Sequence, residues 1–148
     1  MHFLLNRGQE IPLAIFDDYE NPDDFYVGFL LALDSEFVLI NAIDKYGEED
    51  GFRAIAVDDI FSIQEYTLYI NRLMRLFHLK NQHRVEIAAG SENALHNLLQ
   101  HAKSKQLSIE INGDENQMGY VTDFDRDTLT IHATNHYCDD LGLSYFTI

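Results

Sequence analysis

The sequence predicts a mainly β protein with helices, of the α+β class, in which two small β-barrels follow one another and are joined by a helical segment. Three observations support this prediction. One stretch of the 148-residue chain repeats another, both copies are rich in short apolar runs typical of strands, and the stretch between them has helical periodicity. We place the first barrel in residues 1–66, a helical connector with a short strand in 67–106, and the second barrel repeat in 107–148.

The two repeated stretches, residues 28–57 and 119–148, align without a gap at a constant offset of 91 residues. Six positions are identical: Gly28/Gly119, Asp34/Asp125, Ile40/Ile131, Ala42/Ala133, Tyr46/Tyr137 and Gly51/Gly142. The acidic pair Glu48-Glu49 recurs as Asp139-Asp140. Chance rarely keeps the glycines, the aspartate and the acidic pair at one offset, so we interpret the stretches as copies of one module.

The charge is distributed in the same pattern. The chain has 25 acidic and 10 basic side chains and a formal charge of −15. Residues 1–65 hold 15 acids and 3 bases, residues 66–111 hold 3 acids and 6 bases, and residues 112–148 hold 7 acids and 1 base. Two acidic modules therefore flank a mildly basic connector. The average surface is expected to repel phosphate backbones and anionic membranes.

Short apolar runs separated by turn residues predict five strands in the first copy. These are residues 11–16, 27–33, 37–43, 52–57 and 60–65. Asp34-Ser35-Glu36 is a tight turn between the second and third strands, and residues 45–51 are a second turn or a longer hairpin loop. A sheet connected by hairpins in this way removes its exposed edges by closing into a small barrel.

Two helices with a short strand between them are predicted in the middle of the chain. Apolar side chains recur at steps of three and four from Tyr66 to Leu79, as on one face of a helix. Ser91 is a good N-cap for the second helix, and Lys103 and Lys105 fall in its last turn. Its apolar stripe is Ala94, Leu95, Leu98, Leu99 and Ala102. The short strand is expected at residues 84–89, and residues 107–111 begin the second barrel, with a turn at 112–114.

A glycine is followed by an apolar residue two positions later and an aspartate six positions later in both copies. The positions are Gly28, Leu30 and Asp34 in the first copy and Gly119, Val121 and Asp125 in the second. With the turn-like segment 57–63, this pattern resembles the signature of Sm-like proteins, which are small five-stranded barrels, often preceded by a helix. The resemblance implies a small-barrel fold in each copy. The tandem is also similar to uncharacterised Firmicutes proteins with two such modules, a likeness that fixes no activity.

The chain departs from the Sm-like pattern at the positions that contact RNA in that family. The family's base-contacting asparagine, four residues after the aspartate, is replaced by Val38 in one copy and Leu129 in the other. The family's later Arg/Lys-Gly pair is replaced by Asp58-Asp59. RNA binding in the usual Sm manner is therefore not expected, because an amide has become apolar and a cation has become two anions.

The second copy ends early. Ile148 corresponds to Val57, so no stretch corresponds to the predicted strand at 60–65. We expect the second barrel either to be completed by another element, such as residues 84–89, or to keep an open edge that can accept a strand from a partner or from a second copy. A strand belonging to a chain that continues past Ile148 is the equally weighted alternative.

Two groups of side chains are candidates for metal binding. His132, His136 and Cys138 would share one face of an extended strand and are chemically competent zinc ligands. No further cluster supplies a fourth ligand at a recognisable spacing, so we favour surface and loop roles. The acidic loop holds Asp17, Asp18, Glu20, Asp23 and Asp24. These could gather calcium, but the loop lacks the EF-hand order, and a solvated acidic loop is the favoured interpretation.

The remaining motifs point away from catalysis. There is no glycine-rich phosphate loop, no HExxH and no CxxC, and we assign no catalytic, cofactor-binding or metal-binding residue and no cofactor. The basic residues Arg72, Arg75, Lys80 and Arg84 are expected to pair with the chain's own acidic modules, with an RNA site there as the alternative.

These observations together predict a non-enzymatic binding or assembly module that acts through barrel edges and loops, as a homo-oligomer or with a protein partner. RNA binding through the basic middle segment is the second hypothesis. The single cysteine suits a reducing cytoplasm, and no membrane span or secretory signal is expected.

Overall fold

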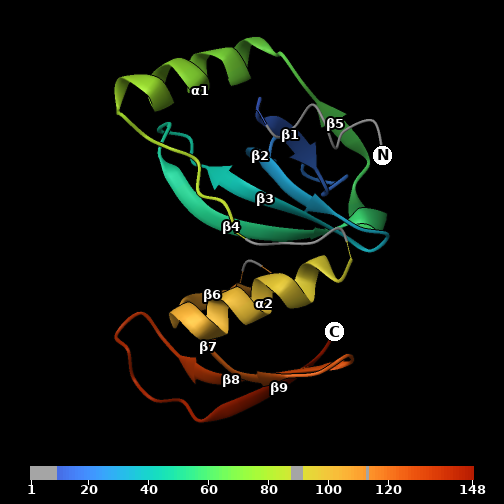
Figure 1. The fold of residues 1–148 in the computed structure, drawn as a ribbon, viewed down its shortest axis with the longest axis vertical. Helices are drawn as coiled ribbons and strands as arrows, with labels where there is room; N and C mark the ends of the chain where they lie inside the picture. Colours follow the sequence, from blue (N-terminus) through green and yellow to red (C-terminus); the bar gives the residue numbers. More distant parts are fainter. Residues whose placement is uncertain (1–9, 88–91, 113) are drawn as a thin grey trace. The chain divides into compact units, whose positions relative to one another are not determined.

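The computed structural model describes residues 10–87, 92–112 and 114–148. The chain forms two compact units, Met1–Leu95 and His96–Ile148. Each unit contains one antiparallel sheet (Figure 1). The described residues are mainly β, with two helices, which confirms the predicted α+β class.

The sheet of the first unit has five strands in the order β4-β3-β2-β1-β5. The strands are β1 (Leu13–Phe16), β2 (Tyr26–Leu33), β3 (Phe37–Ile43), β4 (Glu49–Ala56) and β5 (Ser62–Gln64). Each pair of neighbours is antiparallel, and a short 3-10 turn, Val57–Asp59, leads from β4 towards β5. Because β4 and β5 are the two ends of this order, no closed barrel is seen among the described strands.

Both faces of the first sheet are buried. The side chains of one face pack together into a hydrophobic core, formed by Leu13, Ile15, Leu30, Leu33, Val38, Ile40, Ala42 and Ile55. The opposite face is covered by helix α1 (Leu68–Leu79), which lies across the sheet in Figure 1. The residues in that second core are Ala14, Val27, Phe29 and Ile43 from the sheet and Ile70, Leu73 and Phe77 from the helix. The second core explains why these strands are apolar on both sides.

Helix α1 begins two residues later than its periodicity predicts. Thr67 is the N-cap, and its Oγ1 accepts a hydrogen bond from the N–H of Ile70 at 3.1 Å. Tyr66 precedes the helix with a φ of 58°, so its side chain does not belong to the apolar stripe and is 58 % exposed. The buried stripe is Ile70, Leu73 and Phe77, at the i, i+3, i+7 spacing of an amphipathic helix.

The second unit has a four-stranded sheet in the order β6-β7-β8-β9. Its elements are β6 (Ser108–Ile111), β7 (Asp114–Phe124), β8 (Thr128–Thr134), β9 (Leu143–Thr147) and most of helix α2 (Ala94–Lys105). The rings of His96 and Phe124 stack with centroids 5.7 Å apart, so α2 covers the sheet face to which Phe124 belongs. The buried apolar side chains among the described residues of this unit are Leu99, Ala102, Val121, Leu129 and Ile131.

Some predicted elements differ from the observed ones. Residues 84–87 are irregular rather than a strand, because the N–H of Val85 donates to a side chain, Asn41 Oδ1, at 2.7 Å. The rest of that predicted strand, residues 88 and 89, lies outside the described residues, as do the predicted N-cap Ser91 and Gly113 of the predicted turn.

The internal repeat extends to the pairing register of the strands. Every described residue pair between β2 and β3 recurs between β7 and β8 at the offset of 91, including the position of a β-bulge. The pairs that flank the bulge are Leu30–Ile40 and Ala32–Leu39 in the first unit and Val121–Ile131 and Asp123–Thr130 in the second. Asp34 and Asp125 close the same turn, since Oδ1 of each accepts two backbone N–H groups. Register and bulges are specific features, so the two sheets are built on one plan.

The two glycines of the repeat allow adjacent strands to approach closely. A Cβ on Gly28 would lie 2.5 Å from the carbonyl oxygen of Asn41, and one on Gly119 would lie 2.2 Å from that of His132. Both distances are far inside van der Waals contact, and the obstacle is backbone.

We expect Gly28→Ala to lower the free energy of unfolding by about 2 kcal/mol, because the added methyl must push two hydrogen-bonded strands apart. Urea denaturation followed by circular dichroism measures this. Ser35→Ala, at an exposed turn position of the same sheet, is the matched control and should change stability by less than about 0.5 kcal/mol. Equal stability of the two variants would contradict the close approach.

Candidate functional site

Asn41 on β3 is the buried polar centre of the first unit. Its side chain is 1 % exposed. Nδ2 donates to Glu49 Oε1 at 2.7 Å and to the carbonyl oxygen of Gly51 at 2.9 Å. Oδ1 accepts from the N–H of Val85 at 2.7 Å. Asn41 therefore joins β3, the beginning of β4 and the chain that follows α1.

The β3–β4 loop is attached to the end of α1 by further contacts. The N–H of Glu49 donates to Gln82 Oε1 at 3.0 Å, and Lys80 Nζ lies 3.1 Å from Glu48 Oε1. Gly47 has a φ of 77° and passes so close to the helix that a Cβ there would lie 2.6 Å from Cβ of Leu76. These contacts and Asn41 hold α1 over the sheet.

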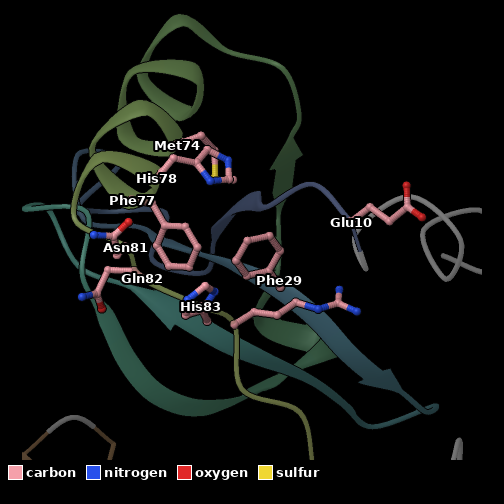
Figure 2. A pocket seen from close by; sticks show the side chains of 9 residues that line it. Glu10, Phe29, Met74, Phe77, His78, Asn81, Gln82 and His83 are labelled. Carbon is pink, nitrogen blue, oxygen red and sulfur yellow. The ribbon is translucent and has the colours of Figure 1, made fainter.

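An open groove of about 530 Å³ runs beside the end of α1 (Figure 2). Phe29 and Phe77 lie next to each other in it, with ring centroids 5.7 Å apart. Its polar residues include His78, Asn81 and Gln82, and Gln82 is already bonded to the backbone of Glu49. Glu10, His83 and Arg84 also line the groove, so it combines apolar and polar groups.

The same frame recurs in the second unit with different side chains. At the offset of 91, His132 takes the place of Asn41 and Asp140 that of Glu49. His132 Nε2 lies 2.6 Å from Asp140 Oδ1. The N–H of Gly142 donates to Asp140 Oδ1 at 2.8 Å, as the N–H of Gly51 donates to Glu49 Oε1 at 2.9 Å. The hydrogen bond from Gly142, followed by that from His132, lowers the pKa of Asp140 below its ordinary value.

The predicted zinc ligands do not share one strand face. β8 ends at Thr134, so only His132 lies in a strand, and His136 and Cys138 belong to the loop before β9. Cys138 is exposed and has a φ of 60°. In the parts of the chain that the structure describes, no three His, Cys, Asp or Glu side chains are grouped as metal ligands would be.

The acidic loop before β2 is arranged around Asp18. Asp18 accepts hydrogen bonds from the N–H of Glu20 at 3.1 Å and from Asn21 Nδ2 at 2.8 Å. The bond from Asn21 lowers the pKa of Asp18. Partial burial, and then the negative charges around it, raise the pKa of Asp17. Hydrogen bonds within the loop therefore fix its conformation. Its described residues include no group of three or more side chains placed to hold a metal ion.

The four predicted basic residues lie in different environments. Lys80 pairs with Glu48, as expected from the acidic module, and Arg84 pairs with Glu86 on its own segment. Arg84 also lies over the ring of Phe29, with Cζ 5.9 Å from its centroid. Arg72 and Arg75 are exposed on the outer side of α1. The four basic side chains therefore do not form one basic patch.

Two surfaces of the second unit lack the cover that the first unit has. β6 takes the place of β1 but has only β7 beside it in the described sheet, whereas β1 lies between β2 and β5. One sheet face also carries exposed aromatic and apolar side chains, among them Tyr120, Leu143 and Tyr145. An open edge in the second copy was one of the alternatives that the sequence left open, whereas this face and the role of Asn41 were not predicted. An isolated amide inside the apolar run Phe37–Ile43 is the signal that could have identified Asn41.

Comparison with protein-family models, curated proteins and solved structures finds no match for this chain. Among the residues described, no helix has the length and apolar character needed to cross a membrane.

We expect Asn41→Ala to destabilise the protein by about 2–3 kcal/mol, because it leaves the N–H of Val85 and the Gly51 carbonyl without their buried partner. His132→Ala, at the equivalent but partly exposed position, is the matched control and should cost clearly less. Urea denaturation of both variants makes the comparison. Equal losses would show that burial of the amide does not distinguish the two units.

Proposed function

We propose that the chain is a tandem of two Sm-like modules that acts as a non-enzymatic protein-binding or assembly module. The repeated glycine and aspartate pattern, the five strands of the first unit and the shared strand register of the two sheets support the Sm-like relationship. The exposed free thiol of Cys138 is compatible with a reducing cytoplasm, where we place the protein.

The observation that carries this proposal is the outer edge of β6. Leu13 pairs with Gly28 in the first unit, and Ile109 pairs with Gly119 in the second, so β6 corresponds to β1. β1 has β5 on its outer side, whereas β6 is the end of the described second sheet. Unpaired N–H and C=O groups along a strand are a template for another strand.

The first unit indicates which backbone groups of β6 are available. The N–H of Phe61 donates to the carbonyl oxygen of Phe16 at 3.0 Å, so Phe16 directs its backbone groups away from β2. Alternate residues of a strand direct these groups to the same side, which gives Ala14 the same orientation. Glu110 corresponds to Ala14 and therefore presents its N–H and C=O at the open edge.

Self-association is the simplest form of strand addition. Two β6 edges paired antiparallel would join two sheets around a two-fold axis, with each copy contributing the same surface. RNA binding is the less favoured function, because Lys80 and Arg84 are engaged with carboxylates and only Arg72 and Arg75 of the four are left without a described ion pair. A formal charge of −15 opposes binding to phosphate backbones.

We expect the chain to form a dimer or larger assembly whose mass, measured by light scattering coupled to size exclusion, changes little between low and high salt. Glu110→Pro removes the N–H at the open edge and should give a monomer, since proline is tolerated at an unpaired strand edge. Glu110→Ala keeps that N–H and is the matched control, which should assemble like the parent chain.

A parent chain that is monomeric at all concentrations would contradict self-association at this edge. A monomer that shifts with a structured RNA pool at low salt only would instead support the RNA hypothesis, because phosphate contacts weaken steeply as salt rises.

A further inference from the structure

One face of the second sheet, which we call the open face, displays a row of exposed side chains. The register places Tyr120 opposite His132 and His132 opposite Leu143, so the three side chains lie on the same side of the sheet. Tyr145, two residues after Leu143, lies on that side as well. Tyr120 is 40 % exposed, Leu143 56 % and Tyr145 71 %. In β9 the intervening Ser144 and Phe146 are half-buried, so the exposed and the covered sides alternate as they should in a strand.

The same face of the first unit is less exposed: Phe52 and Ala54, which correspond to Leu143 and Tyr145, are half-buried. Phe29 and Asn41, which correspond to Tyr120 and His132, are 3 % and 1 % exposed. Phe29 packs in one core with Ile70, Leu73 and Phe77 of α1. The chain thus contains one copy of this face with its cover and one copy without it in the described residues.

The covered copy shows which interactions its cover makes. The helix presents an apolar stripe at the i, i+3, i+7 spacing to the ring of Phe29. Past the end of the helix, Lys80 reaches Glu48 at 3.1 Å. The extended chain that follows donates the N–H of Val85 to Asn41. The cover therefore consists, in order along the chain, of a helix, a cation and an extended segment.

The open face has a counterpart for each of these interactions. Tyr120 replaces Phe29 as the aromatic surface for an apolar stripe. Asp139 replaces Glu48 as the acceptor for a cation and is exposed. The His132–Asp140 pair replaces Asn41–Glu49 and can receive a backbone N–H. Glu110 pairs with Met118, two residues before Tyr120, so it lies on the same face and adds a further negative charge where the first unit has the buried Ala14.

We propose that the open face binds a partner protein through a basic amphipathic helix followed by a short extended segment. Apolar burial against Tyr120, Leu143 and Tyr145 supplies the affinity, and the acidic surroundings select a helix that carries cations. Residues 112–148 hold 7 acids and 1 base, which gives the complementary charge. Helix recognition through residues at i, i+3 and i+7 is a recurrent binding mode. The exposed apolar residues of this face lie on β7 and β9, and Glu110 alone is shared with the β6 edge, so this inference goes beyond the proposed self-association and is tested by variants in β9.

The chain itself provides the probe. A fluorescein-labelled synthetic peptide of residues 66–87 contains the α1 stripe, Arg72, Arg75, Lys80 and the segment through Val85. We expect saturable binding of this peptide to the full-length chain by fluorescence anisotropy. Tyr145→Asp and, separately, Leu143→Asp should each weaken binding at least tenfold, because both place a charge on the open face. Tyr19→Asp, at a tyrosine of the first unit that is 81 % exposed, is the matched control and should bind like the parent chain.

A second probe tests the helix. A peptide with Leu73→Asp and Phe77→Asp should not bind, since its apolar stripe is interrupted. Hydrogen exchange of the complex should show added protection in β7, β8 and β9.

Three results would overturn the proposal. The first is no binding of the parent peptide. The second is binding that Tyr145→Asp and Leu143→Asp leave unchanged, or protection confined to the first unit. The third is a peptide-free dimer that Tyr145→Asp disrupts and Glu110→Pro does not, since the occupant would then be a second copy.

Discussion

The organisation of the first unit depends on the buried amide of Asn41. A primary amide removed from water must keep its hydrogen bonds, or it costs more free energy than it contributes. Asn41 meets this requirement with three groups from different parts of the chain: Glu49, the Gly51 carbonyl and the Val85 N–H. The chain after α1 is therefore held against the sheet, and the helix before it is held over Phe29 and its neighbours. Without that cover, Ala14, Val27, Phe29 and Ile43 would face water.

The second unit keeps the frame and changes the residue at its centre. Four features recur at the offset of 91: the turn aspartate, the β-bulge, the glycine where two strands approach closely, and a carboxylate that accepts the N–H of the glycine two residues later. His132 replaces the amide, and its partner Asp140 is exposed. The side chain of His132 is 44 % exposed and stays in contact with water, whereas Asn41 is 1 % exposed and finds its hydrogen-bond partners within the protein. The duplicated module thus exists in a closed form and an open form, and the binding roles proposed for the chain belong to the open form.

Much of this fold could be predicted from the sequence because it depends on local signals. The gap-free repeat predicted the matching sheets, and Asp34 and Asp125 marked turns that their side chains do close. Helix α1 followed its apolar periodicity, apart from Tyr66, whose positive φ is set by the turn into the helix.

Other features depend on contacts between distant residues, and sequence patterns carry little information about these. Residues 84–87 alternate like a strand, but Val85 donates its N–H to Asn41, 44 residues earlier, instead of to a neighbouring strand. His132, His136 and Cys138 would lie on one strand face only if β8 continued past Thr134. The strand ends there instead, and the chain enters the loop that carries Asp139 and Asp140. The exposure of Tyr120 could not be read from its residue type, because Phe29 at the equivalent position is buried by α1.

Hydroxyl-radical footprinting of the purified chain tests the central claim most directly, since it reports the solvent access of equivalent side chains in one experiment. Phe29 and Tyr120 are both reactive aromatic residues at matched positions, and Phe77 reports the underside of α1. We expect slow oxidation of Phe29 and Phe77 and fast oxidation of Tyr120, Leu143 and Tyr145. Similar oxidation rates for Phe29 and Tyr120 would contradict this expectation, because α1 would then not shield the first sheet from solvent any more than the second sheet is shielded.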